Sequence, residues 1–136
     1  KERGSEMMLH IPFRPCPCPR PKVTHYGTFY GKNYTAFKQV VNEWLDKQKI
    51  EKLEGALEAE MVFGIPMPDS WSKKKKEANL LRPHIVKPDV DNFIKSVFDI
   101  LNERAFDDDS QIARLRASKI WVDGPGHILV EIKGTD

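Results

Sequence analysis

Aspartates gather in two short segments of the chain, and their spacing is suited to chemistry. The first segment holds Asp89 and Asp91, and the second is the run of three aspartates at 107–109. Residues 89–109 include seven acidic and two basic residues, whereas the whole chain has a formal net charge of +2. Carboxylates about 4 Å apart repel one another by several kcal/mol at a surface-like dielectric constant, and a divalent cation relieves that cost. An acidic centre in an otherwise basic chain therefore predicts metal-dependent hydrolysis of a phosphodiester.

Such hydrolysis needs a positioned water, stabilisation of the crowded phosphorus and help for the leaving oxygen. Paired hard cations about 4 Å apart supply all three. Mg²⁺ prefers carboxylate and water oxygens, so an all-aspartate site predicts Mg²⁺, with Mn²⁺ as a substitute. The expected ligands are Asp89 and Asp91 from one segment and Asp109, with Asp108 beside it, from the other. Asp107 is interpreted as a cap or a solvated acid, because neighbouring carboxylates in an extended chain point in opposite directions.

A helix is predicted between the two acidic segments, because apolar residues recur with helical spacing after Asp91. Asp91 can cap that helix. Thirteen helical residues span about 20 Å, so the two segments do not meet through spacing alone. The site closes only if the chain doubles back after Arg104 and Gln111 begins a strand that runs past Asp89.

Lys95 lies one turn beyond Asp91 on the polar stripe of the same predicted helix. Its ammonium group could hold the scissile phosphate or orient a water. It could equally form an i, i+4 ion pair with Asp91 or Asp99, worth a few tenths of a kcal/mol, and the sequence leaves both interpretations open. A calcium-binding loop is excluded, because Phe93 and Ile94 stand where that motif requires an Asp or Asn and a Gly.

Basic residues away from the acidic segments indicate a partner with many phosphates. Residues 7–42 contain no acid, and their basic residues alternate with aromatic residues that could stack on bases. Residues 73–76 are four consecutive lysines. Plainer explanations exist for both, since rings can pin a loop to the core and a lysine run can be a solvated face. The expected phosphate contacts are Arg14, Arg20, Lys22, Lys32, Lys73, Lys74, Lys75, Lys76 and Lys119.

Hydrophobic periodicity predicts a single α+β domain over residues 7–134, with a mixed sheet of about four strands and two main helices. The predicted strands are 8–13, 57–65, 111–122 and 127–133, and the turn at 123–126 is expected to join the last two as a hairpin. A helix capped by Asn33 is predicted up to Leu45, a short lysine-bearing helix is expected to begin at Ser70 or Ser72, and a third helix follows Asp91. Five prolines between residues 12 and 21 predict a long loop that extends to about Lys32.

Residues 1–6 are interpreted as a tag or an upstream remnant. No apolar run reaches the roughly 18 residues that a membrane span requires, and the beginning lacks the pattern of a secretion signal. We therefore expect a cytoplasmic protein without a membrane partner. Cys16 and Cys18 are interpreted as free thiols, because a zinc site usually recruits four Cys or His ligands and His25 is the nearest further candidate.

The segment "KPDVDNFIKSVFDILN", followed by "AFDDDSQI" and a lysine at position 119, resembles the RusA family of Holliday junction resolvases. The resemblance covers about residues 57–133, in the order D-x-D-N-x-x-K-x-x-x-D, a short gap, D-D-x-Q and a basic strand hairpin. "PDSWSKKKK" is similar to phage-type members. The resemblance implies a RusA-like fold and a homodimeric, Mg²⁺-dependent endonuclease that nicks four-way DNA junctions symmetrically, as a crossover junction endodeoxyribonuclease of prophages would.

By the same resemblance, Asp89, Asp91 and Asp109 would be the catalytic acids that bind metal, Lys95 the catalytic-site lysine and Asp108 an auxiliary acid. Symmetric cutting of a two-fold junction also calls for a two-fold protein, so a C2 dimer is expected. Two other functions stay open. One is a DNA- or RNA-binding module without catalysis, and the other is a metal-dependent nuclease that acts on flaps or other branched nucleic acids.

Overall fold

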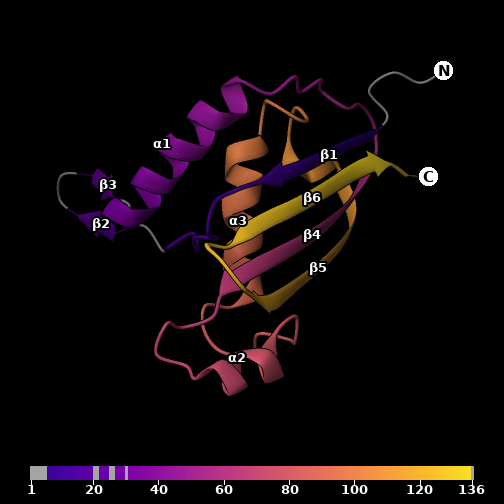
Figure 1. Cartoon of the computed structure of the whole chain (residues 1–136). Coiled ribbons are helices and arrows are strands. Elements are labelled where there is room, and N and C mark those ends of the chain that lie inside the picture. Colours follow the sequence, from indigo (N-terminus) through magenta and orange to yellow (C-terminus); the bar gives the residue numbers. More distant parts are fainter. Residues whose placement is uncertain (1–5, 20–21, 25–26, 30, 136) are drawn as a thin grey trace.

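Four strands form the central sheet. The computed structural model describes residues 6–19, 22–24, 27–29 and 31–135, and for 22–24 and 27–29 it describes the backbone alone. The strands of the sheet are β1 (Glu6–Ile11), β4 (Leu57–Pro66), β5 (Ile112–Val122) and β6 (His127–Gly134). They lie in the order β1-β6-β4-β5, with β4 and β5 parallel and the other neighbours antiparallel (Figure 1).

Helices and one small hairpin complete the described chain. They are α1 (Lys32–Asp46), α2 (Lys73–Asn79), α3 (Val90–Leu101), the 3-10 turn η1 (Asp109–Gln111), and the paired strands β2 (Lys22–Thr24) and β3 (Gly27–Phe29). Within the described ranges, no helix combines the length and the apolar character that crossing a bilayer requires. The predicted α+β domain with a mixed four-stranded sheet is confirmed, and α1 and α3 are its two main helices.

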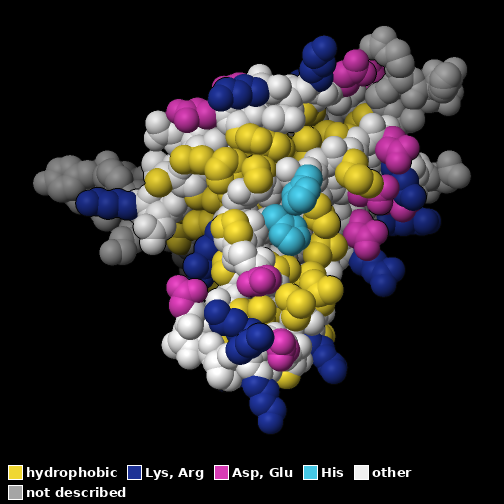
Figure 2. Space-filling view, in the orientation of Figure 1, with side chains coloured by type: hydrophobic (Ala, Val, Ile, Leu, Met, Phe, Trp, Pro, Cys, Tyr) yellow, Lys and Arg dark blue, Asp and Glu magenta, His cyan; other side chains and the backbone are white. Residues whose placement is uncertain are grey.

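The core lies between α3 and one face of the sheet. Alternation along β4 puts Leu57, Met61 and Phe63 on that face, where all three are fully buried. The ring of Phe63 stacks on that of Phe93 from α3, with the centroids 5.2 Å apart. Figure 1 shows α3 behind the sheet and α1 on the side of β1. The other face of the sheet is open, and Figure 2 shows hydrophobic and charged side chains mixed on it.

The predicted hairpin between the last two strands is wrong. β5 and β6 do not pair, because β4 lies between them. The turn at residues 123–126 instead crosses the end of β4. Gly126 has φ +95° there, and a Cβ at this position would lie 2.9 Å from the carbonyl oxygen of Gly64. A tight hairpin and a turn across a neighbouring strand both favour glycine at positive φ, so the local sequence does not distinguish them.

Two element boundaries and one loop also differ from prediction. β1 begins at Glu6, which pairs with Lys133, so the first strand begins two residues before the predicted start at Met8. α1 has Gly31 at its N-cap rather than Asn33, and no side chain caps its first turn. The β2-β3 hairpin falls in a stretch predicted as loop, because it lies beyond the last proline of the proline-rich segment.

Candidate active site

Asp89, Asp91 and Lys95 lie at the start of α3. Asp89 is the N-cap residue and Asp91 is in the first turn, so the prediction that Asp91 caps the helix is wrong. All three residues are exposed. None of their side chains has a hydrogen bond or ion pair with another described residue, so the ion pair considered for Lys95 does not form within this part of the chain. The N-terminus of a helix carries a partial positive charge, which favours carboxylates at this place.

Lys119 fixes the loop that leads into Asp89. This half-buried residue lies on β5, which runs past the loop as the predicted closure requires. Its Nζ donates hydrogen bonds to the carbonyl oxygen of Val86 at 2.8 Å and to that of Pro88 at 2.7 Å. The sequence predicted Lys119 as a phosphate contact. That contact stays a prediction; in the structure the ammonium group donates to two backbone carbonyls and so ties β5 to the loop before Asp89.

A buried histidine supports the same loop. His84 is 4% exposed, and the centroid of its ring lies 4.4 Å from that of Trp121. Its backbone N–H donates to the carbonyl oxygen of Lys119 at 3.0 Å. Burial, and then the charge of Lys119, lower the pKa of His84 below its ordinary value. His84 therefore packs as a neutral ring. Nothing in the sequence around this histidine indicated that role.

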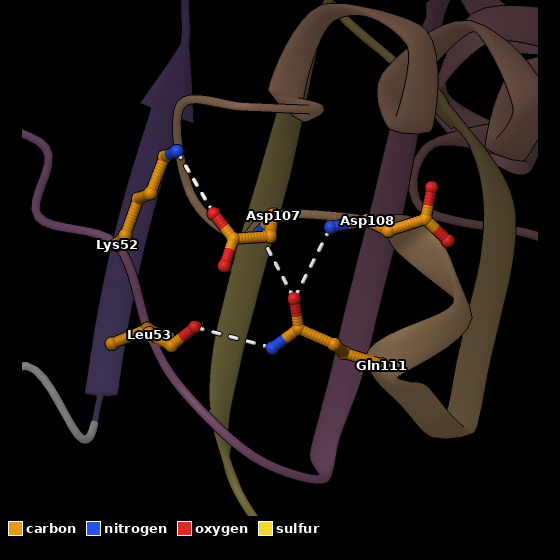
Figure 3. Close-up of polar contacts among 5 residues, drawn as sticks. All are labelled: Lys52, Leu53, Asp107, Asp108 and Gln111. Atoms are coloured by element: carbon orange, nitrogen blue, oxygen red, sulfur yellow. Dashed lines mark hydrogen bonds and ion pairs between the residues drawn. The ribbon is translucent and has the colours of Figure 1, made fainter.

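Gln111 organises the second acidic segment (Figure 3). Its Oε1 accepts hydrogen bonds from the backbone N–H groups of Asp107 at 2.9 Å and Asp108 at 3.1 Å. Its Nε2 donates to the carbonyl oxygens of Leu53 at 3.3 Å and Gly55 at 3.1 Å. One side chain thus joins the acidic segment to the chain that leads into β4. An Asp followed three residues later by Gln is a capping-box signal, and this role could have been predicted from it.

The three aspartates of this segment have different surroundings. Asp107 pairs with Nζ of Lys52 at 2.9 Å. Asp108 caps η1, because its Oδ2 accepts the backbone N–H of Ser110 at 2.9 Å, and hydrogen bonding from Ser110 lowers the pKa of Asp108. Asp109 is half-buried, and its side chain has no hydrogen bond or ion pair to the residues that the structure describes. Of the three, Asp109 is therefore the one whose carboxylate is not already engaged.

A single chain does not bring the two acidic segments together. Asp89 precedes α3 and Asp109 follows it, and the 12 residues of the helix span about 18 Å. β5 leads back along the helix, and its first residue, Ile112, follows closely after Asp109. Lys119, which contacts the loop before Asp89, is about 23 Å from Ile112 at the usual rise of a strand. The two acidic segments therefore lie near different ends of β5. Across the described ranges, no three His, Cys, Asp or Glu side chains gather so that they could hold a metal ion. The closure predicted for one chain is therefore not found.

Asp99 joins α3 to α1. The hydroxyl of Tyr34 donates to Oδ2 of Asp99 at 2.5 Å, and Nζ of Lys38 lies 3.7 Å from the same oxygen. Burial, and then the hydrogen bond to Asp99, raise the pKa of Tyr34 above its ordinary value. The last aspartate of the D-x-D-N-x-x-K-x-x-x-D pattern thus holds two helices together and lies away from the acids at the start of α3.

The lysine run lies on α2. Ser72 caps this helix as predicted, since its Oγ accepts the backbone N–H of Lys75 at 3.1 Å. Nζ of Lys75 lies 4.4 Å from the ring centroid of Trp71. Figure 2 shows basic side chains gathered at the α2 end of the molecule. This surface could contact phosphates, as predicted for residues 73–76.

The other expected phosphate contacts are dispersed. Arg14 is exposed on the proline-rich loop, and Lys32 is exposed as the first residue of α1. Arg20 and the side chain of Lys22 lie outside the described residues. The loop with Arg14 packs against the start of α3, because the backbone N–H of buried Cys18 donates to the carbonyl oxygen of Asn92 at 3.0 Å. Both cysteines are free, as predicted.

Comparisons with known proteins agree with the resemblance in the sequence. The chain matches the family described as endodeoxyribonuclease RusA over residues 12–133. It is also similar to a protein of Bacillus subtilis (strain 168) described as "Uncharacterized protein YqaN", with 39% identity over 95 residues. That match covers 65% of this chain and 66% of the relative, which is just under two thirds of the relative's length. Residues 12–133 include both acidic segments, the strands β4 and β5 and nearly all of β6, and the chain therefore belongs to the RusA family of DNA-cleaving endonucleases.

Proposed function

We propose that the chain is a Mg²⁺-dependent endonuclease that resolves four-way DNA junctions by paired, symmetric nicks. Membership of the family supports hydrolysis of DNA. The observation that carries the proposed site is a contrast among its acids. The side chains of Asp89, Asp91 and Asp109 have no partner among the described residues, whereas the other three aspartates of residues 89–109 each have at least one. Unpaired carboxylates are the ligands that a hard cation prefers.

Asp89 and Asp91 would hold Mg²⁺ through their carboxylate oxygens, which fits a donor set without sulfur or imidazole. When bound, the ion supplies charge stabilisation at the phosphate and makes a water more acidic. Lys95, one turn after Asp91, would bind a non-bridging oxygen of the scissile phosphate and offset the charge that develops there. Lys119 would act as a positioning residue, because it holds the backbone that leads into Asp89.

The third acid would come from a second copy of the chain. Because Asp89 and Asp109 lie before and after α3, whose 12 residues span about 18 Å, we propose a two-fold dimer that places Asp109 of the partner subunit beside Asp89 and Asp91. A two-fold axis makes the arrangement reciprocal, so a single contact surface builds two equal sites. Two equal sites suit a junction that is cut symmetrically. A cytoplasmic location is proposed because the substrate is DNA.

Mixing two inactive variants tests the shared site. If the sites are shared, a dimer of one Asp91→Asn chain and one Asp109→Asn chain has one site with both changes and one intact site. Both homodimers would be inactive, and after subunit exchange the mixture should recover about one quarter of the nicking, since half of the dimers are mixed. If each chain built its own site, every site in the mixture would be defective. Mixtures without activity, after exchange verified by mass spectrometry, would therefore refute the shared site.

A comparison of substrates tests the junction preference. Asp91→Asn should bind a four-way junction as the unmodified chain does and should not nick it in Mg²⁺ or Mn²⁺, and EDTA should abolish nicking by the unmodified chain. Equal cleavage of flaps and junctions would favour the alternative of a nuclease for other branched nucleic acids. Binding that weakens steeply with salt, without product in either metal, would favour a binding module.

A further inference from the structure

Two aliphatic side chains next to the proposed site are exposed to solvent. Ile85 is 87% exposed and Val86 is 54% exposed, and both lie in the loop that leads from α2 to Asp89. Full burial of such a side chain is worth about 1.5–3 kcal/mol. Single exposed aliphatic residues are ordinary on protein surfaces. Two in succession, immediately before a proposed catalytic acid, form a small apolar surface that a ligand could cover.

The backbone around these residues is fixed to the edge strand β5. The backbone N–H of Leu81 donates to the carbonyl oxygen of Trp121 at 2.8 Å, and that of His84 donates to the carbonyl oxygen of Lys119 at 3.0 Å. On the other side, Nζ of Lys119 binds the carbonyl oxygen of Val86. Ile85 therefore projects from a loop whose backbone is held both before and after it.

The charges around the loop indicate which partner covers it. Residues 70–88 include six basic residues and one acid, Glu77. A second copy that docked here through its own residues 70–88 would bring two strongly basic surfaces together, and their charges would repel. In the proposed dimer the partner reaches Asp89 and Asp91 with its acidic segment and not with this basic loop, which leaves Ile85 for the substrate. A nucleic acid combines phosphates, which the basic residues attract, with apolar base faces, which an aliphatic side chain can contact.

We propose that Ile85, supported by Val86, is an apolar wedge that contacts base faces at the branch point of the junction, while the lysines of α2 contact phosphates of an adjoining arm. Proteins that kink DNA insert aliphatic or aromatic side chains between base steps in this way. At a branch point the stacking of base pairs is already interrupted, so entry there needs less unstacking than entry into a duplex. The inference rests on the proposed function, because it requires branched DNA at Asp89 and Asp91.

Fluorescence of 2-aminopurine tests the wedge. The probe is a four-way junction with one 2-aminopurine at the branch point, bound in Mg²⁺ by chains that carry Asp91→Asn so that no cutting occurs. We expect binding to raise the fluorescence, since an unstacked 2-aminopurine emits more strongly. Adding Ile85→Ser should remove most of that rise and leave junction affinity within about three-fold, with an unchanged salt slope because no phosphate contact is lost. Ile85→Met should keep the rise.

Leu129→Ser is the matched control, because Leu129 is also an exposed aliphatic residue, at 37%, but lies on the open face of the sheet. It should leave the fluorescence rise intact. An equal rise with and without Ile85→Ser would overturn the wedge, as would the absence of any rise at the branch point. Loss of dimer in sedimentation of Ile85→Ser would also overturn it and assign this surface to the second copy. Cleavage of an unlabelled junction by the unmodified chain tests the proposed function separately, so the two can fail independently.

Discussion

Replacement of Lys119 by methionine distinguishes the role that the structure gives this residue from the one predicted by the sequence. Methionine keeps most of the length and apolar character of the lysine stem and removes the ammonium group. The change deletes two hydrogen bonds, at 2.8 Å to Val86 and at 2.7 Å to Pro88, from the backbone that leads into Asp89. The loop should then move while the sheet below it keeps its packing.

The magnitude follows from these two bonds. A hydrogen bond to a charged group contributes about 1.5–3 kcal/mol. Water can replace part of this, because Val86 is 54% exposed, and removing a half-buried ammonium group also removes its desolvation cost. We expect a net loss of about 2 kcal/mol, which lowers Tm by roughly 6 °C for a domain of this size. A shift of Asp89 by about 1 Å should lower kcat for junction cleavage about 100-fold.

Denaturant unfolding, junction binding and single-turnover cleavage together provide the assay. Lys133→Met is the control, since Lys133 is exposed on β6 and has no side-chain partner among the described residues. Lys119→Arg should recover part of the stability and the cleavage, because a guanidinium group can also bridge two carbonyls. The reasoning is refuted if Lys119→Met leaves Tm unchanged, weakens binding to all DNA equally and reduces the salt slope by about one, which is the signature of a phosphate contact.

Three further predictions concern stability. Tyr34→Phe should cost about 1–2 kcal/mol in urea unfolding without changing cleavage per folded molecule, because it removes the hydrogen bond to Asp99; a loss of cleavage at unchanged stability would contradict this. Gln111→Ala should cost about 3 kcal/mol, since four backbone groups lose their partner, and a cost below 1 kcal/mol would show that water replaces it. Burial lowers the pKa of His84 from 6.5, so the unfolded chain binds this proton more readily; its contribution is full above pH 6.5 and is lost as the pH falls toward the folded pKa. His84→Phe should flatten part of this slope in unfolding curves between pH 5 and 8, and an unchanged slope would assign it to other groups.

The strands and helices could be predicted because their signals are local. Alternation along residues 57–65 and helical spacing along residues 37–45 each reflect one buried face. Strand order could not be predicted in the same way. Whether the turn at 123–126 closes a hairpin or crosses β4 depends on which strand β4 pairs with, and those partners lie far away in the sequence. The local glycine signals are compatible with both arrangements.

The residue types of the proposed site could be read from the sequence, but the different partners of its aspartates could not. Asp89, Asp91 and Lys95 stand within seven positions, and their spacing alone suggests a common site. The role of Asp99 depends on Tyr34, 65 residues away, and that of Asp107 depends on Lys52, 55 residues away. The sequence does not distinguish these acids. In the structure, some of them bind structural partners and others have no partner among the described residues.

The position of α3 explains why a shared site would make functional sense. α3, whose 12 residues span about 18 Å, lies between Asp89 and Asp91 at its start and the segment that holds Asp109 after its end. A lone chain would therefore bind DNA through its basic surface without a complete set of metal ligands. Cleavage of DNA would require a dimer, and both sites would form when two copies associate. If the chain nicks two strands of a junction in concert, as proposed, this arrangement would prevent an isolated chain from making a single unpaired nick.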